Sequence, residues 1–272
     1  MSYDSVDVWS EPNLFKLDGF GRMSHVAGVP PDYFSPDGQL WGNPLYDWDK
    51  MREDGFKWWQ DRLSYMLSMF DGVRIDHFRA IESYYSVDAS AKNAKNGKWL
   101  KGPGREFVDM LKSIAENKLI IAEDLGNITD EVRVLVEYSG FLSMRVFQFG
   151  FLDGNDTIHK PHHYNEKSVA YTGTHDNNTL LGYVWGMDES RRCEMIEYCG
   201  YMGEDWDCCY DAILKTMFVS NAGIVIFPIQ DLLGYGSDTR LNIPGKVDGN
   251  GQFRVTREQL LSIDCEKFKK FN

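Results

Sequence analysis

The sequence has few cysteines, and none of them lies in a pattern that would build a metal site or a disulfide framework. Their number is odd, C-x-x-C spacing is missing, and no histidines cluster near them. We therefore predict reduced thiols and no metal site. The five cysteines are Cys193, Cys199, Cys208, Cys209 and Cys265.

Long apolar runs and basic stripes are also missing. No segment reaches the roughly 18 apolar residues of a membrane span, and the first ten residues, MSYDSVDVWS, have neither a basic region nor an apolar core. The net charge of −12 is spread along the chain, which argues against a nucleic-acid or anionic-membrane partner. We expect a cytoplasmic protein that binds neither.

What the sequence does contain predicts an α/β fold. Its hydrophobic content of 43% over 272 residues suffices for one substantial core. Linkers, low-complexity tracts and internal repeats are missing, so residues 1–272 are predicted to form a single domain. Short apolar runs alternate with helical patterns in a β-then-α order, which is typical of parallel sheets.

The predicted strands are Gly72–Ile75, Leu119–Ala122, Met144–Phe149, Val169–Thr172 and Ile224–Phe227. The predicted helices are Asp49–Phe70, Arg105–Glu116, Thr129–Tyr138, Glu189–Cys199 and Trp206–Val219, and a further helix is expected to begin at the capping box Thr256–Gln259.

Carboxylates follow three of these strands. Asp76 lies in DGVRIDHFR, Glu123 in IIAEDLG and Asp176 in YTGTHDNNT. In barrels of parallel strands, residues at the carboxyl ends carry the chemistry, so the three acids are expected on one rim. Arg74 lies two residues before Asp76, on the same face of the strand, and favours the ionised carboxylate. Taken alone, Arg74 and Asp76 would fit a surface ion pair equally well.

Three acids on one rim suit the cleavage of glycosidic bonds, which needs a nucleophilic carboxylate and a carboxylic acid that protonates the leaving oxygen. Much of the 14% aromatic content has the spacing of helix cores. Trp41 instead lies in a Gly- and Pro-bearing loop, where its ring can stack on a sugar or anchor the loop itself.

Beyond these patterns, the chain resembles the amylomaltases, the 4-alpha-glucanotransferases of the alpha-amylase superfamily. RIDHFR, AEDLG and THDN occur in this order and match the three catalytic segments of the family. The resemblance extends through VAGVPPDYFSPDGQLWGNPLYDW, NGKWLKGPG and QDLLGYGSDTRLNIPG, and so covers nearly the whole chain.

The resemblance implies a retaining 4-alpha-glucanotransferase that acts on maltooligosaccharides without a cofactor. By resemblance, Asp76 is the nucleophile, Glu123 the general acid/base and Asp176 the acid that stabilises the transition state. Retaining chemistry then predicts that the carboxyls of Asp76 and Glu123 lie about 5–5.5 Å apart. The expected sugar-binding residues are Arg74, His77, His175, Asn177, Trp41, Asp7, Phe149 and Asn242, of which Phe149 fits core packing equally well.

The resemblance further implies a TIM-type (β/α)8 barrel, of which this chain supplies about the last five strand-helix units. The segment Tyr3–Trp9 matches the part of the family that follows the third barrel strand. We therefore expect a chain truncated at its N-terminus, with exposed strand edges and little transfer activity unless a missing segment or complementing chain is supplied. An α-glucoside hydrolase with the same acids, or an inactive glucan-binding fragment, are the alternatives.

Overall fold

The computed structural model describes residues 1–31, 35–152, 157–203, 205–246 and 248–271. It consists of two compact units, Met1–Ser143 and Met144–Asn272, which are described in turn. The expectation that residues 1–272 form one domain stays a prediction.

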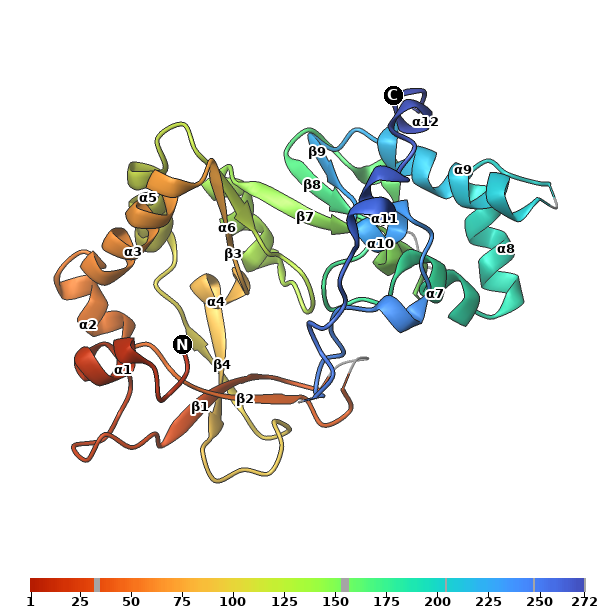
Figure 1. Ribbon diagram of the computed structural model, residues 1–272. Helices are drawn as coiled ribbons and strands as arrows, with labels where there is room; N and C mark the ends of the chain where they lie inside the picture. The colour runs from red at the N-terminus through yellow and green to blue at the C-terminus, as the bar shows by residue number, and fades with distance from the viewer. Residues whose placement is uncertain (32–34, 153–156, 204, 247, 272) are drawn as a thin grey trace. The chain divides into compact units, whose positions relative to one another are not determined.

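Parallel strands form the central layer of the first unit. Strand β3 (Gly72–Ile75) pairs in parallel with β6 (Leu119–Ala122) along its full length, and β6 pairs with β7 (Leu142–Val146) through residues 142 and 143. β3 and β6 have the predicted bounds. Helices follow these strands (Figure 1), so the parallel α/β arrangement is confirmed.

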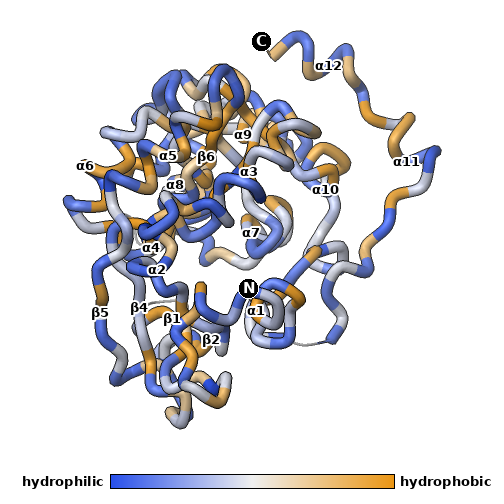
Figure 2. Tube along the Cα trace, turned by 90° about the vertical axis from the view of Figure 1, so that its left-hand side faces the viewer, coloured by the Kyte–Doolittle hydropathy of each residue, from blue (hydrophilic) through white to orange (hydrophobic). Residues whose placement is uncertain are grey.

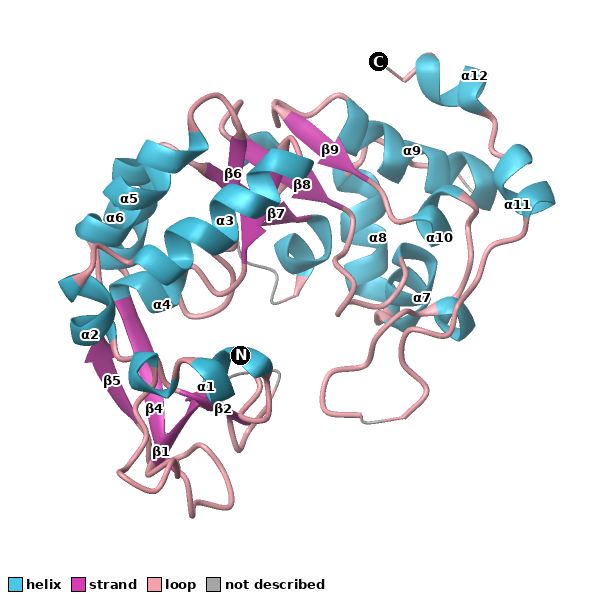
Figure 3. Ribbon diagram, turned by 60° about the vertical axis from the view of Figure 1, so that its left-hand side comes forward, coloured by secondary structure: helices cyan, strands magenta, loops and turns pink. Residues whose placement is uncertain are grey.

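An antiparallel sheet in the same unit was not predicted. Its strands follow the order β2-β1-β4-β5 (Figure 3), and a β-then-α order throughout is therefore wrong. Strands β4 and β5 lie in the sequence between β3 and β6. The pairing of β1 with β4 joins residues about 60 positions apart, and sequence periodicity contains no signal for such a distant pairing. The four strands are β1 (His25–Val29), β2 (Gln39–Pro44), β4 (Ser83–Asp88) and β5 (Lys98–Lys101).

The predicted helix Asp49–Phe70 is interrupted near its start. Gly55 and Phe56 both have positive φ, 71° and 64°, a conformation that glycine adopts freely and phenylalanine rarely. Phe56 is buried and meets Phe107 edge-on at 5.3 Å between ring centroids, so core packing offsets the strained backbone. The remaining helices of this unit are α1 (Val6–Ser10), η1 (Pro12–Leu14), α2 (Trp48–Glu53), α3 (Lys57–Met69), α4 (Arg79–Glu82), α5 (Arg105–Ala115) and α6 (Asp130–Ser139).

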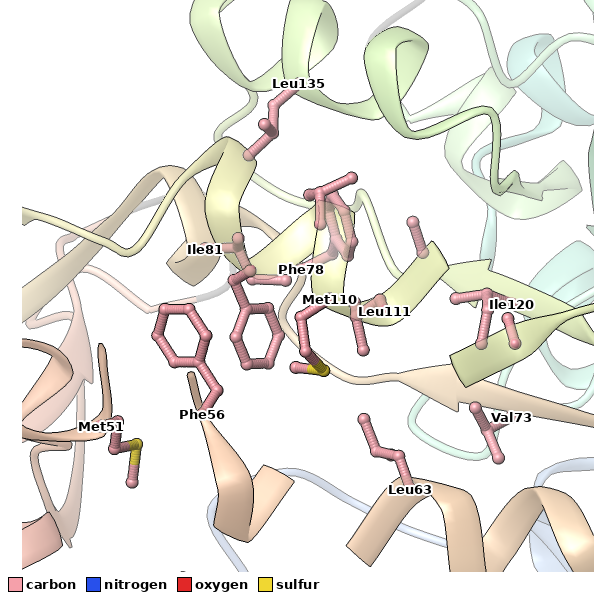
Figure 4. Packing of buried hydrophobic residues seen from close by; sticks show 14 of the residues in the cluster. Met51, Phe56, Leu63, Val73, Phe78, Ile81, Met110, Leu111, Ile120 and Leu135 are labelled. Atoms are coloured by element: carbon pink, nitrogen blue, oxygen red, sulfur yellow. The ribbon is translucent and has the colours of Figure 1, made fainter. Parts of the chain in front are cut away.

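The core of the first unit lies between the parallel strands and their helices (Figure 4). Leu63 and Leu67 of α3 are buried, as the helical spacing predicts, whereas Phe70 is 55% exposed, because the helix has already ended at Met69. Phe78 is completely buried. This core fixes the ends of β3 and β6 on which the acids lie.

The second unit contains the parallel pair β8 (Ser168–Tyr171) and β9 (Ile224–Ile226). Its helix α9 (Trp206–Phe218) has an apolar stripe, with Tyr210, Ile213 and Met217 buried. Figure 2 shows both hydrophobic (orange) and hydrophilic (blue) residues along the helices. The other helices here are η2 (Phe147–Phe151), η3 (Pro161–His163), α7 (Leu180–Gly186), α8 (Glu189–Tyr198), α9 (Trp206–Phe218), α10 (Ile229–Leu232), η4 (Ser237–Thr239), α11 (Arg257–Leu261) and α12 (Cys265–Lys269).

Two local predictions in this unit have opposite outcomes. The strand prediction Met144–Phe149 is wrong beyond Val146, because the chain there forms the 3-10 helix η2. The side chain of Gln148 is buried in this helix and donates to the carbonyl of Asn178. The capping box at Thr256 is confirmed, with reciprocal hydrogen bonds between Thr256 and Gln259.

Among the residues that the structure describes, no helix is both long and apolar enough to cross a bilayer.

Candidate active site

The parallel pairing of β3 and β6 brings Asp76 and Glu123 to neighbouring strand ends. Ile75 lies opposite Ala122 in the register, and each acid is the next residue of its strand. The backbone amide of Glu123 donates to the carbonyl of Ile75 at 3.0 Å, and the amide of Phe78 donates to the carbonyl of Glu123 at 3.0 Å. The sequence prediction that these two strand ends share one edge is confirmed.

Glu123 is buried, and burial raises the pKa of its carboxyl to about 7, with the charge of nearby Asp76 as the second cause. Two backbone amides and Arg74 oppose this rise: His77 N–H donates to Oε2 at 2.7 Å, and Leu125 N–H donates to Oε1 at 3.0 Å. Glu123 can therefore both hold and release a proton near neutral pH, as a general acid/base must.

Asp76 lies in a different environment. Its side chain is 77% exposed, and Oδ1 forms an ion pair with Nη2 of Arg74 at 2.8 Å. The pair of carboxyls therefore combines a solvated group in an ion pair with a buried, protonatable one. Such a difference in environment separates the roles of two acids in glycoside chemistry.

His77 connects this site to the antiparallel sheet. Its backbone is left-handed, with φ 48°, and this conformation accompanies the hydrogen bond from its amide to Glu123. Its ring meets the exposed Trp41 edge-on at 4.9 Å between centroids. The prediction that Trp41 lies in a loop is wrong, because its segment pairs with β1 as strand β2. Burial lowers the pKa of the imidazole to about 4. Among the described side-chain atoms, Nε2 of His77 is one of the few that are buried without a hydrogen-bond partner.

The charge of Asp76 can be tested through the proton on Glu123. We predict that Asp76→Asn lowers the pKa of Glu123 from about 7, because a negative neighbour that opposes ionisation is removed. The expected decrease is about one unit or less, because Asp76 is exposed and solvent screens its charge. The measurement is a ¹³C NMR titration of the Glu123 carboxyl.

Asp71→Asn is the matched control. Asp71 lies just before β3, is fully exposed and pairs with Lys118 at 3.3 Å, so its loss should leave the pKa of Glu123 unchanged. An unchanged or higher pKa in Asp76→Asn would contradict a contribution of the Asp76 charge to the pKa of Glu123.

The third predicted acid lies in the second unit, in the loop between β8 and α7. Asp176 is exposed, and its Oδ2 lies 3.4 Å from Nε2 of His175. Asn177 does not extend freely from the loop: its Oδ1 accepts from both the amide and the hydroxyl of Thr174, at 2.9 and 2.8 Å. Asn177 therefore shapes the loop that presents Asp176. That Asp176 joins Asp76 and Glu123 on one rim stays a prediction.

Asn242 contacts this loop directly, since its Nδ2 donates to Oδ1 of Asp176. Arg240, which was not among the predicted site residues, donates from Nη2 to the carbonyl of Asp176 at 2.6 Å and from Nε to the carbonyl of Asn242 at 2.8 Å. The signal for Arg240 was its position in the RLNIP segment, two residues before Asn242.

Two further predicted sugar-binding residues have partners other than the acids. Asp7 of α1 lies 3.6 Å from Nη1 of Arg62 on α3. Phe149 of η2 is partly buried and meets the ring of His159 edge-on at 5.5 Å. Their sugar-binding roles stay predictions.

In the part of the chain that the structure describes, no group of three or more His, Cys, Asp or Glu side chains is arranged to hold a metal ion. The cysteines found there are free.

Comparison with known proteins relates the chain to transferases of α-glucans. The family model described as 4-alpha-glucanotransferase matches residues 1–260. The 4-alpha-glucanotransferase of Streptococcus pneumoniae serotype 4 is 44% identical over 258 residues, and that of Aquifex aeolicus is 41% identical over 257 residues. Each match covers 94% of this chain, and 51% and 53% of the respective relative. The chain thus spans about half the length of these relatives.

A solved structure, the amylomaltase from Streptococcus agalactiae in complex with acarbose, is similar over 99% of this chain and 54% of its own. The TM-score is 0.92 and the sequence identity 37%. The amylomaltase from Corynebacterium glutamicum has a TM-score of 0.74 at 16% identity, which supports the likeness in fold.

Proposed function

The chain belongs to the 4-alpha-glucanotransferase family, and from this premise we propose that it carries the catalytic acids of a retaining transferase that moves α-1,4-glucan segments between maltooligosaccharides or to glucose. The observation that supports the proposal most directly is the pairing of a buried Glu123, whose carboxyl has a pKa of about 7, with the solvated Asp76–Arg74 ion pair.

In the proposed reaction, the carboxylate of Asp76 attacks the anomeric carbon while Glu123 protonates the glycosidic oxygen. The bond between the anomeric carbon and the glycosidic oxygen breaks, and the part of the glucan that carries this oxygen leaves. The remaining segment is esterified to Asp76. Glu123, now ionised, takes the proton of an acceptor hydroxyl, whose oxygen displaces Asp76 from the anomeric carbon. The enzyme returns to its starting protonation state. Asp176, with His175 and Asn242, is proposed to bind the sugar at the cleavage site.

Transfer requires an acceptor hydroxyl to compete with water, and Trp41 is proposed to favour the acceptor. The indole is 40% exposed and lies against His77, whose amide contacts Glu123. An aromatic face next to the acid/base can stack on an acceptor sugar and displace water there. The hydrolase alternative differs in this respect, since it would pass the glucan segment to water rather than to a sugar hydroxyl.

We further propose that the parallel strands are part of a TIM-type barrel whose remaining strands lie in the half of the relatives that this chain does not match. The similarity to a longer amylomaltase with a TM-score of 0.92 supports this. The glucan-binding surface would then be incomplete in residues 1–272, which favours weak binding by the chain alone.

Product analysis tests the function. The chain is incubated with maltotriose, alone and mixed with the separately produced N-terminal half of the Streptococcus pneumoniae relative. We expect little transfer by the chain alone and, in the mixture, longer and shorter oligosaccharides with little net hydrolysis. Glucose in excess of longer products would identify a hydrolase. No turnover in the mixture, combined with measurable binding of maltooligosaccharide, would favour the glucan-binding alternative, and full activity of the chain alone would refute the incomplete-barrel proposal.

A further inference from the structure

Asp231 is a completely buried carboxylate that takes no part in the proposed chemistry. It lies on α10 and contacts both ends of the loop that carries His175 and Asp176. Its Oδ2 accepts from the hydroxyl of Thr172 at 2.5 Å, and its Oδ1 accepts from the amide of Leu180 at 2.7 Å. Thr172 directly follows β8, and Leu180 is the first residue of α7.

The backbone around Asp231 is itself held by hydrogen bonds. The hydroxyl of Tyr210, on α9, donates to the backbone carbonyl of Asp231 at 2.8 Å, and the side-chain amide of the neighbouring Gln230 donates to the carbonyl of Thr239 at 3.1 Å. The core of the second unit therefore fixes Asp231, and Asp231 fixes the distance between the two ends of the loop.

The same stretch of chain also contacts the middle of the loop. Ser237 accepts from the side chain of Asn178 at 2.9 Å, while Arg240 and Asn242 contact Asp176. Residues 230–242 thus hold the loop at its two ends and at its tip. Gln148 also contacts the loop, since it donates to the carbonyl of Asn178 at 2.8 Å.

Packing alone does not account for an aspartate at this position. Burying a carboxylate is costly unless hydrogen bonds compensate, and the partners of Asp231 are a hydroxyl and an amide rather than a cation. An apolar side chain would avoid that cost, but it would leave the amide of Leu180 and the hydroxyl of Thr172 buried without an acceptor. The carboxylate satisfies both at once.

We infer that Asp231 is a positioning residue, which acts through Thr172 and Leu180 to set the conformation of the 173–179 loop and the aim of Asp176. The inference deepens the proposed function and rests on it, since it assumes that Asp176 binds the sugar at the cleavage site. Asparagine keeps both links in this role, because its Oδ1 can accept from Leu180 and its Nδ2 can donate to the Thr172 hydroxyl. It loses only the acceptor for the hydroxyl proton.

The test compares Asp231→Ala with Asp231→Asn in the full chain, with exposed Asp238→Ala of the same segment as the control. Two quantities are measured: amide hydrogen exchange of residues 173–180 relative to α9, and the affinity for acarbose by calorimetry or NMR. In Asp231→Ala, we expect loop exchange to rise at least about tenfold, with α9 still protected, and acarbose affinity to fall about tenfold or more. Asp231→Asn and the control should stay within about threefold of the parent.

Unchanged loop exchange in Asp231→Ala would overturn the inference. It would also be overturned if Asp231→Asn lost as much loop protection and acarbose affinity as Asp231→Ala, or if loop exchange rose in Asp231→Ala without a loss of acarbose affinity. If Asp231→Ala does not fold, Thr172→Val, which removes one donor, is compared with Thr172→Ser, which keeps it, and the same pattern is expected. Should Asp176→Asn bind acarbose as tightly as the parent chain while loop exchange follows the expected pattern, the proposed sugar-binding role of Asp176 would fail and the control of the loop by Asp231 would stand.

Discussion

Asp76→Ala and Glu123→Gln are each expected to lower maltotriose disproportionation at least about 10³-fold, because the first removes the proposed nucleophile and the second the proposed proton donor. Folding should be little affected. Asp76 is 77% exposed, so its truncation opens no cavity. Glutamine has the shape of glutamate, and its single side-chain oxygen can still accept from the amide of His77 or from that of Leu125. The measurement is the initial rate in the mixture with the complementing N-terminal half.

Asp71→Ala is the control for Asp76, since it removes an exposed carboxylate from the opposite end of the same strand. It should keep the parent rate. A variant of Asp76 or Glu123 within tenfold of the parent would remove that residue from the chemistry. If both variants keep the parent rate, the retaining mechanism through this pair is wrong.

Phe78→Ala is expected to destabilise the first unit by about 3–5 kcal/mol, because a completely buried ring leaves a cavity that the core fills only in part. Phe78 lies two residues after Asp76, its amide donates to the carbonyl of Glu123, and its ring meets Phe141 edge-on at 6.1 Å. The measurement is urea unfolding monitored by circular dichroism, with the free energy of unfolding compared between variant and parent.

Phe20→Ala provides the comparison, because this ring is 84% exposed and its loss should change the free energy of unfolding by less than about 0.5 kcal/mol. A loss below about 1 kcal/mol in Phe78→Ala would mean that the ends of β3 and β6 do not depend on this core. The close placement of Asp76 and Glu123 would then need another explanation.

The sequence by itself determined the elements whose signals are local. Short apolar runs predicted β3 and β6 with their observed bounds, helical spacing predicted the buried stripe of α9, and the Thr256 capping box is present as expected. Each of these follows from residues a few positions apart. The neighbouring positions of Asp76 and Glu123 were also predictable, because parallel strands present their carboxyl ends at one edge.

Tertiary structure decided what depends on contacts between distant residues. The antiparallel sheet pairs β1 with β4, the break at Phe56 is offset by burial against Phe107, and η2 replaces the end of a predicted strand. None of these leaves a periodic signal in the sequence. Family resemblance indicated which segments matter, but it did not indicate how they contact one another.

The chemistry of the site divides in the same way. The residue types in the sequence alone indicated an acid pair with a neighbouring arginine. Burial and the charge of Asp76 on the neighbouring strand decided the proton affinity of Glu123. The hydrogen bond from Leu180 to Asp231, 51 residues further along the chain, decided how the Asp176 loop is supported. Both depend on desolvation and on hydrogen bonds that exist only once the chain has folded, because the carboxylates are solvated in the unfolded chain.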